Sequence, residues 1–186
     1  MEMSQKQKEK ILGIVKKAVY EYVLTGKRLS RDYARKQIPE IFNRKEGVFV
    51  TIYKLKELRG CIGFTYPVNA FGGALIESAV LSASADPRFE PINKKDLDEL
   101  SFEVTVLEKP ELLDKERIKE DIQIGRDGLI VSNPYTTGLL LPQVAIEENL
   151  DQISFLEQTC IKAGLNKDAW KESSVKVYKF RGEYFS

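Results

Sequence analysis

The stretch VFVTIYKLKELRGCIGF, residues 48–64, decides the fold of this chain of 186 residues. Its first arm, residues 48–53, is rich in β-branched and aromatic side chains, and its second arm, residues 58–64, is largely apolar again. A charged segment, residues 54–57, separates the two arms. Two strand-forming arms joined by a short polar connection predict a β-hairpin.

Helical patterns lie on both sides of this hairpin. Apolar residues recur at helical spacing over residues 4–25, and Gly26 follows as a C-terminal stop. Ser30 is suited to be the N-cap of a short second helix. A third helix is expected from Pro67 to about Ala85, and its many small residues predict close packing against a sheet.

The second half of the chain alternates between strand and helix patterns. Residues 101–107 alternate apolar and polar side chains, which is the period of a strand with one buried face. The pair Asp127-Gly128 predicts a second hairpin between flanking apolar segments. The segments expected here are strands over residues 122–124, 129–131, 138–141 and 174–180 and one helix over residues 145–163. The whole pattern predicts an α+β fold with a mixed, mainly antiparallel sheet and flanking helices.

Composition excludes several classes of function. The 29 basic and 28 acidic residues give a net charge of +1, which provides no field to attract nucleic acid or an anionic membrane. No segment approaches the run of about 20 apolar residues that a membrane-spanning helix requires. The two cysteines lack the paired spacing of a zinc or thioredoxin motif and fit a reducing environment, so a cytoplasmic location is expected.

The chain contains no histidine, which removes the commonest general base and the commonest transition-metal ligand. Any chemistry must therefore use cysteine, carboxylates, lysine, arginine, tyrosine or an external cofactor. The sequence identifies no such cofactor, and no metal site is expected.

The segment Arg59-Gly60-Cys61-Ile62-Gly63 is the first candidate site. Its two glycines permit close approach of the backbone, and a neighbouring cation favours the thiolate form of a cysteine. One interpretation is a reactive Cys61 beside Arg59 as an anion binder. The other is a tight strand edge with a buried cysteine, since cysteine is among the most often buried residue types.

Three further segments combine polar groups with breaks in regular structure. Asp86-Pro87-Arg88 follows the third helix, where its charged pair either binds a ligand or forms a salt bridge at a helix end. Gln143 follows a proline in an apolar run and either contacts a ligand or bonds to local backbone. Cys160 to Gly164 reads as the capped end of a helix, with Cys160 on its core side.

The order of several motifs resembles that of the AMMECR domain family. The motifs are Leu58-Arg59-Gly60-Cys61-Ile62-Gly63, Asp86-Pro87-Arg88-Phe89, residues 100–108, Gly128-Leu129-Ile130, Leu141-Pro142-Gln143-Val144 and Cys160-Ile161-Lys162-Ala163-Gly164-Leu165. The resemblance covers about residues 10–180. It implies a single domain over residues 1–186 with two lobes, of which the larger is built from both chain ends, and it places the Leu58 to Gly63 motif near a cleft. The family implies no defined activity.

Two functions remain open from the sequence. The first is an enzyme or small-ligand-binding protein in which Cys61 is the nucleophile, Arg59 stabilises the thiolate or an anion, and Asp86 with Arg88 orients the site. The remaining ligand-binding candidates are Leu58, Gly60, Ile62, Gly63 and Gln143. The alternative is a module that binds a protein or nucleic acid without catalysis, although the charge balance disfavours nucleic acid. The basic patch for that alternative is Lys6, Lys8, Lys10, Lys16 and Lys17.

Overall fold

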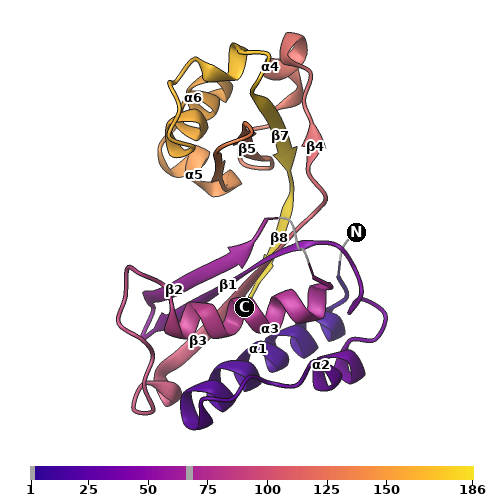
Figure 1. Ribbon diagram of the computed structural model, residues 1–186, viewed down its shortest axis with the longest axis vertical. Coiled ribbons are helices and arrows are strands. Elements are labelled where there is room, and N and C mark those ends of the chain that lie inside the picture. Colours follow the sequence, from indigo (N-terminus) through magenta and orange to yellow (C-terminus); the bar gives the residue numbers. More distant parts are fainter. Residues whose placement is uncertain (1–2, 66–68) are drawn as a thin grey trace. The chain divides into compact units, whose positions relative to one another are not determined.

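The computed structural model describes residues 3–65 and 69–186, which form two compact units. The first unit contains both chain ends, residues 1–107 and 183–186, and the second unit is the intervening segment, residues 108–182. Each unit has its own four-stranded sheet and its own apolar core. The α+β class expected from the sequence is confirmed, with the strands divided between two antiparallel sheets (Figure 1).

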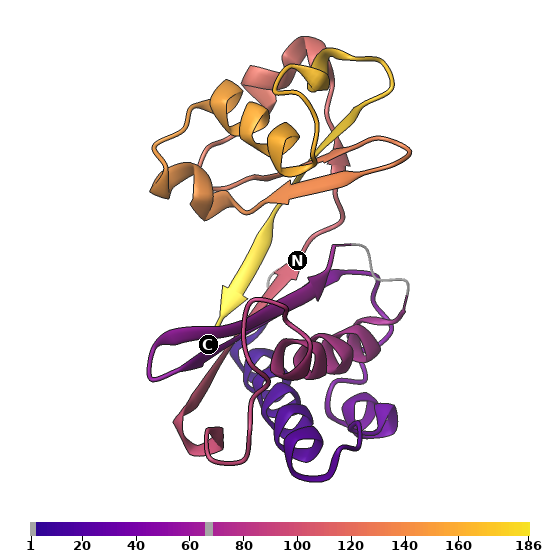
Figure 2. The same cartoon turned by 60° about the vertical axis from the view of Figure 1, so that its left-hand side comes forward.

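The first unit packs helices on one face of its sheet. Its elements are α1 (Gln5–Thr25), α2 (Arg31–Gln37), β1 (Gly47–Lys54), β2 (Glu57–Phe64), α3 (Phe71–Ser84), a 3-10 turn (Leu97–Glu99), β3 (Leu100–Leu107) and β8 (Gly182–Phe185). The strand order is β2-β1-β3-β8. Alternate residues of β1 and β3, including Val48, Val50 and Val104, are buried with residues of α1 and α3 in one core. Figure 2 shows the helices of this unit on one side of its sheet.

The predicted caps Gly26 and Ser30 are confirmed, and Ser4, which was not predicted as a cap, begins the first helix. Ser4 accepts a hydrogen bond from the amide of Gln7 and begins α1, while Gly26 ends it in the left-handed conformation at φ 72°. Ser30 accepts from the amide of Asp32 and begins α2. The third helix ends at Ser84 as expected, whereas Pro67 lies outside the described residues.

The second unit builds the order β4-β7-β5-β6. Its elements are β4 (Glu111–Leu112), a 3-10 turn (Lys115–Arg117), α4 (Ile118–Asp121), β5 (Gly128–Ser132), β6 (Thr137–Leu140), α5 (Pro142–Glu147), α6 (Gln152–Lys162), a 3-10 turn (Ala169–Lys171) and β7 (Lys176–Phe180). Cys160 lies in its core without exposure, as predicted. The short strands β4 and β8 were not predicted, because neither Glu111–Leu112 nor Gly182–Phe185 contains the apolar run or the alternation that marks a strand.

Two expectations for the second unit are wrong. Residues 122–124 are not a strand, and β5 pairs with β6 and β7 instead. The Asp127 side chain is fully buried and accepts hydrogen bonds from the Gln123 amide and the Arg126 guanidinium. These bonds fold residues 123–127 into a compact loop, so Asp127-Gly128 does not form the two-residue turn of a hairpin.

The single helix expected over residues 145–163 is two helices, α5 and α6. Asn149 adopts a positive φ of 53°, which interrupts the helical path, and Asp151 then caps α6 by accepting from the Ser154 amide. Because of the break, Ile146 is 63% exposed although the helical period placed it on the core side. The apolar period alone did not reveal a change of direction between two short helices.

Candidate functional site

The Cys61 segment forms the edge strand of the first sheet. Among the described strands, β2 pairs with β1 alone and ends the strand order β2-β1-β3-β8. The register places Cys61 directly opposite Thr51, and the Thr51 hydroxyl donates a hydrogen bond to Cys61 Sγ at 3.3 Å. The thiol is half-buried, and it belongs to the face of the sheet opposite the core residues Val50 and Ile52.

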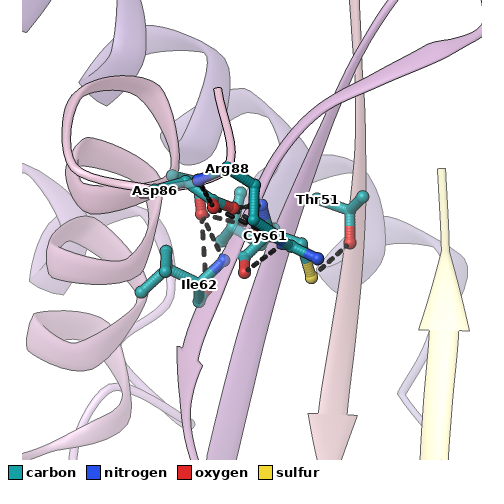
Figure 3. A network of polar contacts seen from close by, with 7 residues as sticks. Thr51, Cys61, Ile62, Asp86 and Arg88 are labelled. Carbon is teal, nitrogen blue, oxygen red and sulfur yellow. Dashed lines mark hydrogen bonds and ion pairs between the residues drawn. The ribbon is translucent and has the colours of Figure 1, made fainter. Parts of the chain in front are cut away.

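The charged pair after α3 holds the backbone of Cys61 (Figure 3). Asp86 Oδ2 accepts the Cys61 amide at 2.8 Å, and Arg88 Nη2 donates to the Cys61 carbonyl at 3.4 Å. The two side chains are joined by two further bonds, Arg88 Nε to Asp86 Oδ1 at 3.0 Å and Arg88 Nη2 to Asp86 Oδ2 at 2.7 Å. Asp86 and Arg88 therefore satisfy the outward-facing amide and carbonyl of Cys61, which a further strand would otherwise pair with. These bonds fix the backbone of Cys61 at the edge of the sheet.

Asp86 is the buried half of this pair. Its side chain is only 2% exposed, while that of Arg88 is 55% exposed. The Arg88 hydrogen bonds hold the pKa of Asp86 well below its usual range, with help from the Cys61 and Arg88 amides and against the effect of burial. The carboxylate is thus ionised across the physiological range and serves as a fixed acceptor.

Ser82 of α3 enters the sheet between β1 and β2. Its hydroxyl accepts a hydrogen bond from the Ile62 amide at 2.8 Å and donates one to the Val50 carbonyl at 2.7 Å. The Ser82 hydroxyl thus bridges Ile62 and Val50, which lie opposite each other in the strand pair. The close approach of α3 requires Gly60, where an added Cβ would lie 2.0 Å from the Ser82 backbone oxygen. The glycine of the motif is therefore explained by packing, and Ser82 is a site residue that sequence reasoning missed.

A register irregularity decides which way Cys61 faces. The pairing shifts between Ile52 and Tyr53, because Leu58 lies opposite Tyr53 whereas Gly60 lies opposite Ile52. Arg59 is thus the extra residue of a β-bulge. If Arg59 were paired opposite Ile52 in a regular ladder, Cys61 would lie opposite Val50 and share the core face with it.

Three strands contribute to one row on the face that carries Cys61. Thr51 lies opposite Cys61 on one side and opposite Glu103 of β3 on the other. Burial raises the pKa of Glu103. Burial also raises the pKa of Tyr53, as do the charges of Glu103 and Cys61, so the phenol lies within electrostatic reach of both. Thr51, Tyr53 and Glu103 were not predicted, since only the strand register brings them beside Cys61.

The other predicted site residues divide between the two units. Leu58 is exposed, and Ile62 and Gly63 are half-buried in β2. Arg59 Nη2 donates to the Glu90 carbonyl at 3.2 Å, while its Nε is buried and has no hydrogen-bond partner within the described residues. Gln143 lies exposed on α5 of the second unit and takes no part in the described network around Cys61.

The lysines of the basic patch are largely engaged within the first unit. Lys8 forms an ion pair with Glu183, at 2.5 Å. Lys16 lies over the Tyr20 ring and Lys17 over the Tyr33 ring, at 5.4 and 4.4 Å from the centroids. These contacts distribute the lysines among separate partners, which is the arrangement of a solvated helix surface.

Two classes of site are not found in the part of the chain that the structure describes. Over residues 3–65 and 69–186, no three metal-ligating side chains lie close enough together to hold a metal ion. No helix among the same residues has the length and apolar character needed to cross a membrane.

The fold and the site define a class: an α+β protein of two units, with a cysteine held at a sheet edge by an Asp-Arg pair. The sequence profile of the AMMECR1 family matches residues 12–185, and the chain belongs to this family. A protein of Methanocella arvoryzae is 44% identical over 171 residues, which cover 90% of this chain and 84% of that protein. A Thermofilum pendens protein is 40% identical, covering 94% and 87% of the two chains.

A solved structure shares the fold. The crystal structure of an uncharacterised protein from Pyrococcus horikoshii matches with a TM-score of 0.87 and 40% sequence identity. The match covers 98% of this chain and 92% of that one.

Proposed function

We propose that this AMMECR1-family protein is an enzyme or binding protein for a small molecule, and that the Cys61 thiol is its reacting group. The observation that carries the proposal is that the backbone of Cys61 is held in place while its thiol stays partly accessible. Asp86 and Arg88 fix its backbone, while its side chain remains half-buried on the opposite face from the core and accepts a hydrogen bond from Thr51. A positioned, partly accessible thiol with nearby donors is the arrangement of a nucleophile.

The contacts limit the role of each neighbour. The Cys61 amide already bonds to Asp86, so the residue does not supply its own amide as a donor to a developing oxyanion. The single hydrogen of the Thr51 hydroxyl already goes to Cys61 Sγ, so the available donor is the exposed guanidinium of Arg88. Asp86 is thus a positioning residue, Arg88 both positions Cys61 and offers a donor, and Arg59 retains the role of an anion binder.

The remaining motif residues shape the site. Gly60 and Ile62 bring β2 against α3 through Ser82, and Leu58 and Gly63 frame the segment in the same strand. Gln143 is retained as a ligand-binding residue on the second unit. Both cysteines are free thiols, which supports a reducing, cytoplasmic location for the protein.

The alternative function, a module for a protein partner, is an outcome that experiment can distinguish. The lysine patch does not favour it, because Lys8, Lys16 and Lys17 already contact residues of their own unit. If Cys61 proves to be a packing residue, the binding-module alternative becomes the better account.

A pair of matched substitutions tests the proposal. We expect Cys61→Ala to change the free energy of unfolding by less than about 1 kcal/mol, because the thiol is not part of the core. The control Cys160→Ala removes a sulfur with no exposure and should cost about 1–3 kcal/mol. Denaturant unfolding measures both values. Equal losses for the two variants would identify Cys61 as a packing residue and contradict the proposal.

A further inference from the structure

The row beside Cys61 contains a carboxyl group that has no partner among the residues that the structure describes. Glu103 lies opposite Thr51, which in turn lies opposite Cys61. Its side chain is partly buried, and burial raises its pKa. Within residues 3–65 and 69–186, no hydrogen bond or ion pair of the Glu103 side chain is found, whereas Asp86 and Asp96 of the same unit are both paired.

The Glu103 carboxyl group is partly desolvated, and no protein donor among the described residues replaces the water that it loses. Placing a carboxylate in a partly dry environment costs free energy unless a donor or a cation replaces the water. Asp96, by comparison, forms an ion pair with the Lys54 ammonium at 2.6 Å and accepts a hydrogen bond from the Asn93 amide at 3.0 Å. Glu103 therefore offers an unused acceptor on the face that carries the thiol.

The surrounding groups determine which ligand this acceptor suits. Tyr53 lies two residues from Thr51 on β1, towards the hairpin and on the same face, and the charges of Glu103 and Cys61 contribute to its raised pKa. The positive charge of Arg88 is compensated by its ion pair with Asp86 at 2.7 Å. The row formed by Cys61, Thr51 and Glu103 thus presents hydroxyl and carboxyl groups, which accept hydrogen bonds from a cationic or N–H-bearing group.

We propose that Glu103, together with Tyr53, is the recognition half of the site and binds an amino or amidino group of the ligand whose reacting atom Cys61 attacks. This inference rests on the proposed function of Cys61 as the reacting group. Neighbouring strands lie about 4.8 Å apart, so Cys61 and Glu103 are separated by about 10 Å of sheet. A ligand the size of an amino acid or a small amide spans this distance once both side chains extend towards it.

Charged thiol reagents test the inference without knowledge of the ligand. Trimethylammonium-ethyl methanethiosulfonate is cationic, and sulfonatoethyl methanethiosulfonate is anionic. In each case the thiolate attacks the sulfenyl sulfur, a mixed disulfide forms and methanesulfinate leaves. The rates are measured for Cys61 by peptide-resolved mass spectrometry at pH 8.5, far above the ordinary pKa of a carboxyl group.

The expected result is a cation preference that depends on Glu103. A full charge at about 10 Å in a half-hydrated site changes each rate by about three- to fivefold, so the cation-to-anion ratio should fall about tenfold in Glu103→Gln. The control Glu9→Gln removes one charge from α1, on the other face of the sheet, and should leave the ratio unchanged. The same two reagents on the unfolded chain give the intrinsic ratio.

The outcomes separate the two proposals. If Cys61 reacts in the folded chain but Glu103→Gln leaves the ratio as it is, the recognition role of Glu103 is overturned while Cys61 remains a reactive thiol. If neither reagent labels Cys61 before unfolding, the proposed function itself fails. Should Glu103→Gln not fold, the wild-type ratio decides alone: a folded chain with the same ratio as the unfolded chain overturns the inference.

Discussion

At the scale of single residues, Asp86 links the sequence motif to the geometry of the site. Both Asp86 and Arg88 were recognisable in the sequence, as a charged pair at the end of a helix. Their target was not, because a carboxylate that bonds to the backbone of another strand leaves no pattern in either segment. The predicted salt bridge between Asp86 and Arg88 is present, and the same pair also forms hydrogen bonds with the backbone of Cys61.

We predict that Asp86→Asn destabilises the protein by about 1–3 kcal/mol at pH 7, because a buried, charge-assisted acceptor is lost. Arg88 is more than half exposed, so solvent screening keeps the loss below that of a fully buried pair. Urea unfolding of the variant and the wild type measures the difference. Asp98→Asn, at an exposed carboxylate of the same unit, is the control and should change stability by less than about 0.5 kcal/mol.

The difference between wild type and Asp86→Asn should depend on pH. The folded pKa of Asp86 is depressed, so its stabilising contribution is complete above the unfolded pKa of about 4 and is lost as the pH falls towards the folded value. We expect the two unfolding free energies to converge progressively below about pH 4. A difference that stayed constant between pH 7 and pH 2 would mean that the Asp86 charge does not stabilise the fold.

At the scale of elements, the hairpin was predictable and its bulge was not. The β-branched first arm and the apolar second arm predicted β1 and β2 within one or two residues of their observed ends. The extra residue, Arg59, changes the register by one and thereby places Cys61 on the face away from the core. No local signal distinguishes Arg59 from an ordinary strand residue, so the sequence left the burial of Cys61 undecided.

The contact between Gly60 and α3 should be intolerant of a side chain. An alanine Cβ would meet the Ser82 backbone oxygen at 2.0 Å, so Gly60→Ala must displace α3 or β2 and should cost about 2–4 kcal/mol. Gly13 in α1 is the control, since a Cβ there meets nothing within 4 Å. Gly13→Ala should stabilise the chain by about 0.5–1 kcal/mol through helix propensity. Similar thermal midpoints for the two variants would contradict the packing of Gly60.

Ser82 should contribute more stability than the neighbouring serine on the same helix. Ser82→Ala leaves the Ile62 amide and the Val50 carbonyl without their bridge and should cost about 1–3 kcal/mol. Among the described residues, the Ser84 hydroxyl bonds only to the Val80 carbonyl of its own helix, so Ser84→Ala should change stability by less than about 0.5 kcal/mol. Denaturant unfolding compares the two, and an equal effect would show that β1 and β2 close up without the bridge.

At the scale of the whole molecule, the α+β class was predictable from the sequence. The order of strands and helices in the second unit was predictable only in part. The strands β5 and β6 were expected close to their observed positions. The predicted hairpin at residues 122–131 was wrong because the buried Asp127 side chain holds a compact loop there. The predicted long helix was wrong because the positive φ of Asn149 interrupts it. Neither property is visible in hydrophobic periodicity.

The expectation of one domain with two lobes is a prediction that Trp170 can test. It is the single tryptophan of the sequence and packs against the core of the second unit, so its fluorescence reports on that unit. If the chain unfolds as one domain, Gly60→Ala in the first unit will shift the Trp170 transition by the full loss of stability. An unchanged Trp170 transition, with a shifted transition by circular dichroism, would show two independently unfolding domains.

The labelling of Cys61 by iodoacetamide in the folded chain tests the central claim most directly, with Cys160 of the same molecules as the internal control. The fraction of each cysteine that is modified over time is measured by mass spectrometry of its peptide, before and after unfolding. We predict that Cys61 reacts in the folded protein while Cys160, which has no exposure, reacts only after unfolding. Protection of both cysteines until the chain unfolds would contradict the account and identify Cys61 as a packing residue.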